Sequence, residues 1–459
     1  MKVIVCGAGQ VGFGIARHLA GEGHDVTVVD RSPSLMRRIA DTLDVRPVLG
    51  HGAHPEVLAE AGAGDADILI AVTASDEVNM VASQIARTLF ETPKIIARVR
   101  DRHYLASRWQ ERLFCDAAIP IDVIISPETA VGDMVMRRLA VPGAFDNAAF
   151  SDARVQMVGI SIGEDCPVTD TPLNQLTGLF PDLRAIVVGL RRDGKTYVPD
   201  FSDTIQPGDE AYLITAATDT ERTLKIFGHE EHQARRIVII GGGSIGTQVA
   251  RALDLQTENY SVTVIEADED RARDLAETLN RGVVLSGNAL SPELLVEAEI
   301  ADADLVLTLT NDDEVNILAT MLALQEGCER GMCIINESTF QPLATRVGME
   351  VVIDPRAITI SSILGHVRQG RVLRVHAVAG GAAEVIEAEI GEASELGGQT
   401  LRDLDLPDGI RIGAVVRGDA PITPRGSTEL KTGDKVTLFA MSDVIETVEK
   451  LFRAGRGQA

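Results

Sequence analysis

The chain has 459 residues, 45% of them apolar and 24% charged, so it is long enough for several domains and too apolar to be disordered. Its formal net charge of −25 argues against a nucleic-acid-binding face and against docking on anionic lipid. The five cysteines lack zinc-site spacing and no apolar run reaches about 18 residues, which disfavours a disulfide framework, a zinc site and direct membrane insertion.

Short strands and helices alternate through the first part of the chain. The pattern predicts strands at 3–6, 25–29, 45–49, 68–72 and 94–99, with helices at 11–20, 34–42, 55–60 and 78–89. Ser32 and Pro33 have the residue types of a helix N-cap and first position. The apolar, β-branched run at 68–72 is typical of a central parallel strand. We therefore expect an α/β domain with a doubly wound parallel sheet.

A different kind of segment follows. Residues 126–139 predict an N-capped helix, which is either a crossover arm or a core helix of the preceding domain. The next segment is rich in strands, with a Pro207-Gly208-Asp209 turn before a short apolar strand and a closing helix that ends near Phe227. This composition predicts a small α+β domain.

The whole arrangement then occurs a second time. Residues 3–12 match 237–246, and residues 64–73 match 301–310. Both matches are followed by Asp-Glu-Val-Asn, at 76–79 and 313–316. The α+β segment also recurs, with Thr432-Gly433-Asp434 in place of the first turn and a closing helix that ends near Phe452. We expect four domains in the order α/β, α+β, α/β, α+β.

Each α/β unit carries a dinucleotide-binding fingerprint in the required context. Gly7, Gly9 and Gly12 lie between a predicted strand and helix, and Asp30 ends the next strand. The glycines permit a tight turn, a close approach of a pyrophosphate and close packing of helix on sheet, while the carboxylate can accept hydrogen bonds from an adenosine ribose. The acid favours NAD(H) over NADP(H), but ATP, ADP and AMP present the same ribose.

The second copy consists of Gly241, Gly243, Gly246 and Glu266. The alternative is a Rossmann-like fold whose glycines serve only the turn. Arg98, predicted to end the fifth strand, can clamp a phosphate or form a surface ion pair. We align it with Asn336 in the second copy, and this loss of charge predicts unequal sites.

The catalytic pattern HExxH does not occur in the sequence, GxSxG matches only at 242–246 inside the second glycine fingerprint, and GxxxxGK[ST] matches at 189–196 in the predicted α+β segment, outside the α/β units. Two nucleotide fingerprints with no catalytic pattern in its required structural context favour a sensor, in which ligand binding shifts a conformational equilibrium. The alternative is an NAD-dependent oxidoreductase with duplicated domains.

These landmarks resemble the TrkA family, the cytosolic regulators of bacterial Trk potassium-uptake systems, which are built from tandem RCK units (regulators of potassium conductance). The resemblance rests on residues 7–12, Asp30, 73–79, 96–98, 241–246 and Glu266, and it covers nearly the whole chain. It implies Rossmann-like N-lobes at 1–122 and 234–353, crossover helices at 123–142 and 354–370, and C-lobes at 143–228 and 371–459.

The resemblance also implies a function and a set of nucleotide contacts. It implies a peripheral cytoplasmic protein, a ring of identical chains, typically a tetramer, that gates a potassium-translocating membrane subunit of the Trk type when NAD(H), ATP or ADP binds. Regulators of potassium/proton antiporters share the same motifs. The implied contacts are Gly7, Ala8, Gly9, Gln10, Val11, Gly12, Asp30, Thr73, Ala74 and Arg98 in the first N-lobe, and Gly241, Gly242, Gly243, Ser244, Ile245, Gly246, Glu266, Thr310 and Asn311 in the second.

Overall fold

The computed structural model describes residues 1–452 except 181, 257–259, 338, 341–342, 345–348, 350, 368–370, 393 and 395. Within this part the chain forms four sheets of six, five, six and five strands, in that order along the sequence. The alternation of α/β and α+β domains is therefore confirmed. We call the sheet-containing segments the first N-lobe (2–125), the first C-lobe (144–226), the second N-lobe (236–353) and the second C-lobe (372–452).

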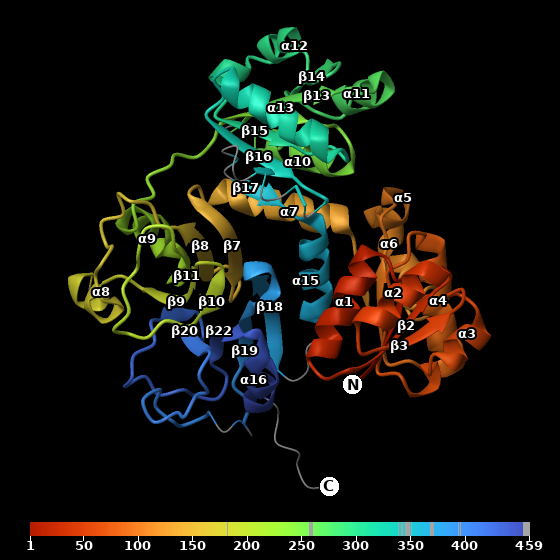
Figure 1. Ribbon diagram of the computed structural model, residues 1–459, viewed down its shortest axis with the longest axis horizontal. Coiled ribbons are helices and arrows are strands. Elements are labelled where there is room, and N and C mark those ends of the chain that lie inside the picture. The colour runs from red at the N-terminus through yellow and green to blue at the C-terminus, as the bar shows by residue number, and fades with distance from the viewer. Residues whose placement is uncertain are drawn as a thin grey trace. The chain divides into compact units, whose positions relative to one another are not determined.

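The first N-lobe is a doubly wound parallel sheet flanked by helices (Figure 1). Its strand order is β3-β2-β1-β4-β5-β6. Its strands are β1 (Lys2–Cys6), β2 (Asp25–Asp30), β3 (Arg46–Leu49), β4 (Ile68–Ala71), β5 (Lys94–Arg98) and β6 (Val123–Ile125). Its helices are α1 (Gln10–Gly21), α2 (Pro33–Thr42), α3 (Pro55–Glu60), α4 (Asp76–Phe90), α5 (Arg102–Leu105) and α6 (Ser107–Leu113).

The predicted elements of this lobe all occur, with ends that agree to within two residues. Strand β4 is buried along its whole length, as a central strand covered on both faces requires. Ser32 caps α2, because its Oγ accepts from the backbone N–H of Leu35, and Pro33 stands in the first turn. Strand β6 and helices α5 and α6 were not predicted.

The second N-lobe has the same topology, with strand order β14-β13-β12-β15-β16-β17. Its elements are β12 (Arg236–Ile240), α10 (Ser244–Asp254), β13 (Ser261–Glu266), α11 (Glu269–Ala276), β14 (Val283–Ser286), α12 (Pro292–Glu297), β15 (Leu305–Thr308), α13 (Asp313–Gln325), β16 (Arg330–Ile334) and β17 (Val351–Ile353). The duplicated sequence thus folds into a duplicated sheet.

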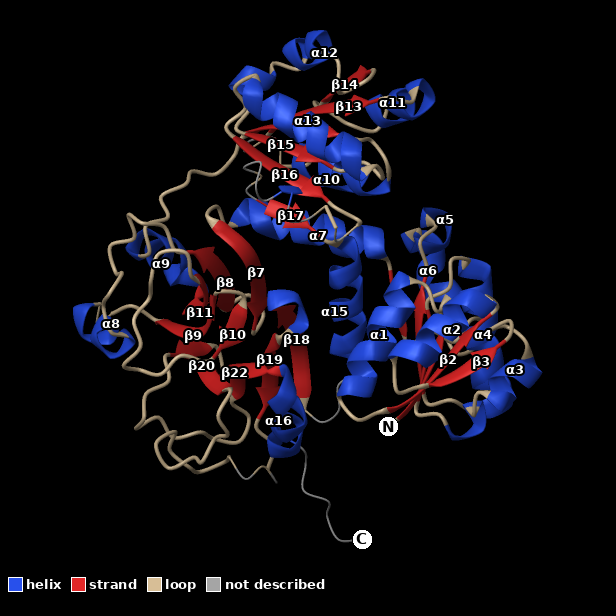
Figure 2. Ribbon diagram, viewed as in Figure 1, coloured by secondary structure: helices blue, strands red, loops and turns tan. Residues whose placement is uncertain are grey.

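Both C-lobes are five-stranded antiparallel sheets with few helices (Figure 2). The first contains β7 (Ala144–Phe150), β8 (Val155–Ser161), α8 (Leu173–Leu179), β9 (Ala185–Arg192), β10 (Lys195–Tyr197), β11 (Glu210–Ala216) and α9 (Thr220–Ile226). The second contains β18 (Val372–Val378), β19 (Ala383–Glu389), β20 (Ile410–Arg417), β21 (Ala420–Ile422), β22 (Lys435–Met441) and α16 (Ile445–Phe452). Short 3-10 helices lie at Ala63–Asp65, Ala217–Asp219, Ile300–Asp302, Ala379–Gly381 and Ser442–Val444.

The two C-lobes share one hydrophobic core, to which both sheets contribute buried side chains such as Tyr212 and Phe439. Glycines make the close approach possible on each side. A Cβ at Gly189 of β9 would lie 2.5 Å from the Phe439 ring, and a Cβ at Gly413 of β20 would lie 2.4 Å from Ile214. The sheets therefore pack through a matched pair of glycine contacts.

We expect Gly189→Val to lower the free energy of unfolding of the C-lobe pair by about 1–3 kcal/mol, because the Phe439 ring is fully buried and cannot move aside. Denaturant unfolding followed by near-ultraviolet circular dichroism measures the change. Gly178→Ala in α8 is the matched control, since a Cβ there meets no atom within 4 Å. Equal stability of the two variants would contradict tight packing at Gly189.

The helices that follow the two N-lobes are α7 (Pro127–Ala140) and α15 (Pro355–Val367). By its contacts the chain divides into two units, one of which contains residues 1–130 together with α15. Ile363, Leu364 and Val367 of α15 belong to the core of the first N-lobe, where Gly14 of α1 gives room to Ile360. Helix α15 is thus a packing arm and not a core helix of the N-lobe that precedes it.

Helix α7 behaves in the corresponding way. Its residues 131–140 belong to the other unit, where a Cβ at Gly132 would lie 2.8 Å from the Gln248 side chain of α10. Each helix therefore packs on the N-lobe that it does not follow. Among the described residues, no helix combines the length and apolar composition needed to cross a bilayer. All five cysteines are free thiols.

Candidate functional site

Four strands of the first N-lobe, β1, β2, β4 and β5, bring the predicted site residues to one edge of the sheet. Strand β1 pairs with β2 on one side and with β4 on the other, so the strand order reverses here. Ligands of doubly wound sheets bind at the carboxyl ends of the strands at such a point. The turn after β1 lies at this edge, between the ends of β2 and β4.

The turn has the backbone that a phosphate site needs. Gly7 has φ +113°, and a Cβ there would lie 2.9 Å from the carbonyl oxygen of Val72, so only glycine fits. At Gly9 a Cβ would meet no heavy atom within 4 Å, which leaves open space beside the backbone. Helix α1 begins at Gln10 and directs its first N–H groups toward this space.

Asp30, the last residue of β2, is held against the turn by two backbone hydrogen bonds. Its Oδ2 accepts from Ala8 N–H (2.7 Å) and its Oδ1 from Ser32 N–H (2.8 Å). Each oxygen keeps one acceptor position, and the side chain is partly exposed. The carboxylate can therefore accept both hydroxyls of a ribose diol.

Thr73 is positioned by Asn79, a fully buried residue of α4. The Asn79 Oδ1 accepts from Thr73 N–H (2.9 Å) and from Thr73 Oγ1–H (2.7 Å), and its Nδ2 donates to the carbonyl oxygens of Thr73 and Arg98. One amide thus ties the end of β4 to the end of β5. Asn316 makes the same four contacts with Thr310 and Ile334 in the second N-lobe.

Asp76, the first residue of the Asp-Glu-Val-Asn motif, also has a structural partner. Its Oδ2 accepts from the N–H groups of Arg100 and Asp101, both at 2.8 Å. The sequence analysis used the motif as a sign of duplication and as a landmark of the family resemblance, so its structural role in joining the ends of β4 and β5 was missed. The signal was available, because an acid and an amide three residues apart share one face of a helix.

Arg98 ends β5 as predicted, and it carries an unsatisfied donor. Its Nε is buried and has no hydrogen-bond partner among the residues that the structure describes. Burial, followed by the nearby charge of Arg100, lowers the pKa of Arg98. An anion at this position would satisfy the donor and stabilise the cation.

The alignment of Arg98 with Asn336 was wrong by two residues. Asn79 donates to the carbonyl oxygen of Arg98, and its counterpart Asn316 donates to that of Ile334. Asn336 instead corresponds to Arg100, because its N–H binds Asp313 as the Arg100 N–H binds Asp76. The second N-lobe therefore has a buried isoleucine where the first has an arginine.

The second N-lobe reproduces the turn and its carboxylate. Gly241 has φ +106°, and Glu266 accepts from Gly242 N–H (2.6 Å) and Asp268 N–H (2.9 Å). Glu266 also forms an ion pair with Arg271 at 2.8 Å, which the sequence analysis did not anticipate. Burial raises the pKa of Glu266, but the hydrogen bonds from Arg271 and the two backbone groups outweigh burial and hold that pKa below its ordinary value.

The remaining predicted contacts flank the two turns. Gln10, Ala74, Ser244 and Asn311 are exposed, whereas Val11 and Ile245 are partly buried and Val11 packs on the core. Gly12 and Gly246 are packed against the turns themselves, since a Cβ at either would lie 1.8 Å from the carbonyl oxygen of Gly7 or Gly241. The third glycine of each fingerprint therefore serves packing.

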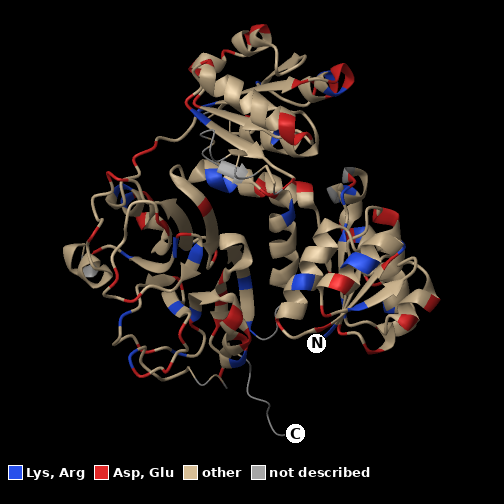
Figure 3. Ribbon diagram, in the orientation of Figure 1, with Lys and Arg blue, Asp and Glu red and all other residues tan. Residues whose placement is uncertain are grey.

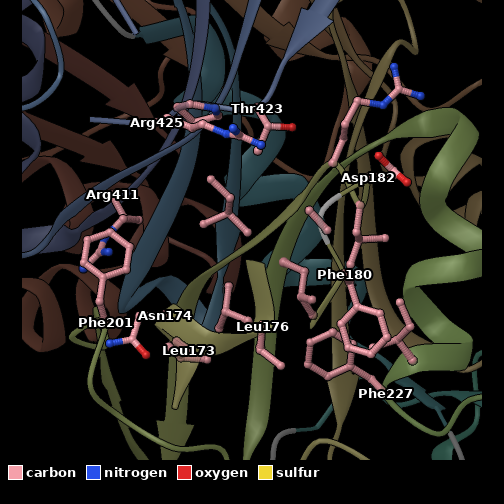
Figure 4. A pocket seen from close by; sticks show the side chains of 18 of the residues that line it. Leu173, Asn174, Leu176, Phe180, Asp182, Phe201, Phe227, Arg411, Thr423 and Arg425 are labelled. Carbon is pink, nitrogen blue, oxygen red and sulfur yellow. The ribbon is translucent and has the colours of Figure 1, made fainter. Parts of the chain in front are cut away.

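A cavity of about 570 Å³ lies in the C-lobes, where the sequence showed no motif (Figure 4). The first C-lobe supplies most of its lining, including the apolar side chains of Leu176, Phe180 and Phe227. The second C-lobe contributes Arg411, whose guanidinium stacks 4.2 Å from the Phe201 ring centroid and donates to the Pro199 carbonyl oxygen. The start of α8 also lines the cavity, but the N–H groups of Leu173 and Asn174 already donate to the carbonyl oxygens of Asp203 and Phe201.

Comparison with known proteins agrees with this architecture. The sequence matches the TrkA-N domain over residues 3–127 and 237–355, and the TrkA-C domain over residues 157–228 and 385–453. It is 51% identical over 453 residues to the Trk system potassium uptake protein TrkA of Azorhizobium caulinodans, with 99% of each chain covered. It is 40% identical over 459 residues to the protein of the same name from Halomonas elongata, again with 99% of each covered.

Solved structures share the fold. The RCK domain of GsuK superposes with a TM-score of 0.58 at 19% identity, covering 98% of this chain and 94% of that one. The GsuK channel bound to NAD gives the same TM-score and identity, covering 98% and 78%. Since the family domains and the full-length relatives agree, the chain belongs to the TrkA family of Trk system potassium uptake proteins.

Proposed function

We propose that this chain is the nucleotide-binding regulatory subunit of a potassium-uptake system. Adenine nucleotides, NAD(H) and ATP or ADP, bind at the carboxyl edge of the N-lobe sheets and gate a potassium-translocating membrane subunit of the Trk type. The observation that carries the proposal is the edge of the first N-lobe, where an open glycine turn, a half-satisfied Asp30 carboxylate and the unsatisfied Arg98 Nε meet.

Each group matches one part of the ligand. The N–H groups of the turn and of the α1 N-terminus bind phosphate, Asp30 accepts from the ribose hydroxyls, and Arg98 binds a further phosphate oxygen. Thr73 and Ala74 border the ligand after β4. In the second N-lobe the corresponding groups are the turn from Gly241 to Ile245, together with Glu266, Thr310 and Asn311.

The groups at this edge favour binding without turnover. Asp30 and Asp76 are engaged by backbone N–H groups, which hold them as acceptors. Burial and the nearby Asp30 charge raise the pKa of Cys6 to about 12, so this thiol stays protonated and is a poor nucleophile. We infer a sensor and not an enzyme.

Helix α1 offers a route from the site to the rest of the protein. Its N-terminus forms the phosphate turn, and its side packs on α15 (Figure 1). Gly14 of α1 gives room to Ile360 of α15. A ligand that displaces the N-terminus of α1 would therefore also displace α15, the helix that precedes the second C-lobe in the chain. Only a ligand that binds one conformation better than the other shifts the equilibrium.

Family membership supports a proposal for the assembly. We propose a homo-oligomeric ring, a tetramer, that sits peripherally on the inner face of the membrane through its partner. The relatives are named for Trk potassium uptake, which favours a Trk-type partner over a potassium/proton antiporter. Within the chain we propose N-lobes at 1–122 and 234–353, crossover helices at 123–142 and 354–370, and C-lobes at 143–228 and 371–459.

The test is calorimetric titration of the full chain with NADH, NAD, ATP and ADP. We expect Asp30→Ala to weaken binding at the first N-lobe by about 10- to 100-fold, because hydrogen bonds to a charged acceptor are lost. Asp25→Ala is the matched control, since Asp25 is exposed at the opposite end of the same strand.

Two results would overturn the proposal. If Asp30→Ala leaves nucleotide binding unchanged, the nucleotide does not bind at the Asp30 edge of the first N-lobe. Consumption of NADH, followed at 340 nm with added metabolites, would identify an oxidoreductase instead. Potassium uptake by cells that carry the membrane subunit provides the functional readout, and nucleotide dependence of uptake should disappear in Asp30→Ala.

A further inference from the structure

Glu266 and Asp30 occupy equivalent positions, but their surroundings differ. Each ends the second strand of its lobe and accepts from a turn N–H and from the N–H two residues onward. Among the residues that the structure describes, Glu266 also binds an arginine and Asp30 does not: Arg271 Nη2 lies 2.8 Å from Glu266 Oε1. The equivalent of Arg271 in the first N-lobe is Leu35, because both donate their N–H to the N-cap side chain of the following helix.

The extra bond changes how many acceptor positions remain for a ligand. A carboxylate has about four lone-pair positions. Asp30 accepts one hydrogen bond on each oxygen, so one position per oxygen is left for a ribose diol. Glu266 accepts two on Oε1 and one on Oε2, so one position is left in all. A nucleotide must displace Arg271 before Glu266 can accept from both hydroxyls.

Burial agrees with this count. The Glu266 side chain is 5% exposed, whereas the Arg271 side chain is 59% exposed, so the guanidinium covers the carboxylate from the solvent side. Helix α11 carries acidic and basic positions close together (Figure 3). The neighbouring Arg273 forms its ion pair with Asp270, at 3.0 Å, instead of with Glu266. Of the two arginines Arg271 and Arg273, it is thus Arg271 that binds the Glu266 carboxylate proposed to contact the ribose.

We propose that Arg271 is a specificity-determining residue that makes the second N-lobe the weaker and less ribose-selective of two adenine-nucleotide sites. This inference rests on the proposed function. It adds that the two N-lobe sites become occupied at different nucleotide concentrations. Ile334 in place of Arg98 acts in the same direction, because it removes the cation at the phosphate end. The chain therefore senses adenine nucleotide over a wider concentration range than two equal sites would.

The experiment isolates one lobe at a time in the full-length chain. Asp30→Ala weakens binding at the first lobe by about 10- to 100-fold. In this background, ADP and 2′-deoxy-ADP are titrated by calorimetry into the otherwise unchanged chain and into Arg271→Leu. We expect Arg271→Leu to tighten ADP binding by about 3- to 10-fold, the size expected for removing an exposed charged competitor. It should also raise the preference for ADP over 2′-deoxy-ADP toward that of the first lobe. Arg273→Leu on the same helix is the control and should change neither quantity.

The reciprocal exchange tests the same idea in the first lobe. In a Glu266→Ala background, Leu35→Arg should weaken ADP binding and lower its preference for the 2′-hydroxyl. That preference is a ratio within one protein, so a loss of stability does not mimic it.

Different failures have different meanings. If the first lobe binds ADP with ribose selectivity but Arg271→Leu leaves the second lobe unchanged, Arg271 does not set specificity. If Arg271→Leu weakens binding, the guanidinium contacts the nucleotide and the inference is overturned. If the parent chain binds no nucleotide at either lobe, the proposed function itself fails.

Discussion

Replacing Gly12 with alanine is expected to destabilise the first N-lobe by about 3 kcal/mol or more. The added Cβ would lie 1.8 Å from the carbonyl oxygen of Gly7 and 2.9 Å from its carbonyl carbon. Those atoms are backbone in a tight turn, so no side-chain rotation can relieve the clash. Either α1 moves away from β1 or the turn opens, and both lose the packing that defines the lobe.

Gly9→Ala separates packing from ligand binding. A Cβ at Gly9 meets no atom within 4 Å and its φ of −63° suits alanine, so the free energy of unfolding should change by less than about 0.5 kcal/mol. Nucleotide affinity should nevertheless fall, because the methyl group occupies the space of the pyrophosphate.

Thermal unfolding measures the stability of both variants, and calorimetry measures their nucleotide affinity. Gly246→Ala should destabilise the second N-lobe as Gly12→Ala destabilises the first. A Gly12→Ala protein that unfolds at the parent temperature would contradict the close approach of α1 to the turn.

We expect Asn79→Leu to lower the free energy of unfolding by about 2–5 kcal/mol, because it leaves several buried polar groups of the sheet edge without partners. The N–H of Thr73 and the carbonyl oxygen of Arg98 both lose the amide that joins them. The β4 and β5 ends should separate, so amide hydrogen exchange of these strands should accelerate and nucleotide affinity should fall together with stability.

Gln84→Leu on the same helix is the matched control for this change. Within the described part of the chain, its amide binds the exposed Thr88 hydroxyl, so its removal should alter stability by no more than about 0.5 kcal/mol. Asn316→Leu should have the same effect as Asn79→Leu, confined to the second N-lobe. Unchanged exchange in β4 and β5 after Asn79→Leu would show that the amide does not hold the edge together.

The parts of the fold that depend on local pattern could be predicted from the sequence. The apolar period gave the strand and helix ends of the first N-lobe to within two residues, and the fingerprint placed Gly7 and Asp30 in contact with one turn. These features are local because a strand, its turn and the following helix are contiguous in the chain. Their duplication then supplied the topology of the second lobe.

The features that failed depend on contacts between distant segments. The ion pair between Arg271 and Glu266 could not be predicted from the sequence. An arginine on the first turn of a helix is usually solvated, and only the structure shows that the Arg271 side chain points back to the end of β13. The misalignment of Arg98 arose because β5 and β16 lack a shared residue to anchor the register, which only the Asn79 and Asn316 bonds provide. The destination of α15 is likewise a tertiary contact that no periodicity encodes.

The position of α15 has a consequence for the order of synthesis. The first N-lobe ends its sheet at Ile125, but the helix that covers α1 begins only at Pro355. At about 5–20 residues per second, a ribosome needs on the order of 10–50 s to make the intervening chain. During that interval the α1 face that carries Gly14 is uncovered, and a fragment that stops after the first C-lobe would keep it so. The two halves of this duplicated protein are therefore not interchangeable modules, because the first is completed by a helix that the second supplies.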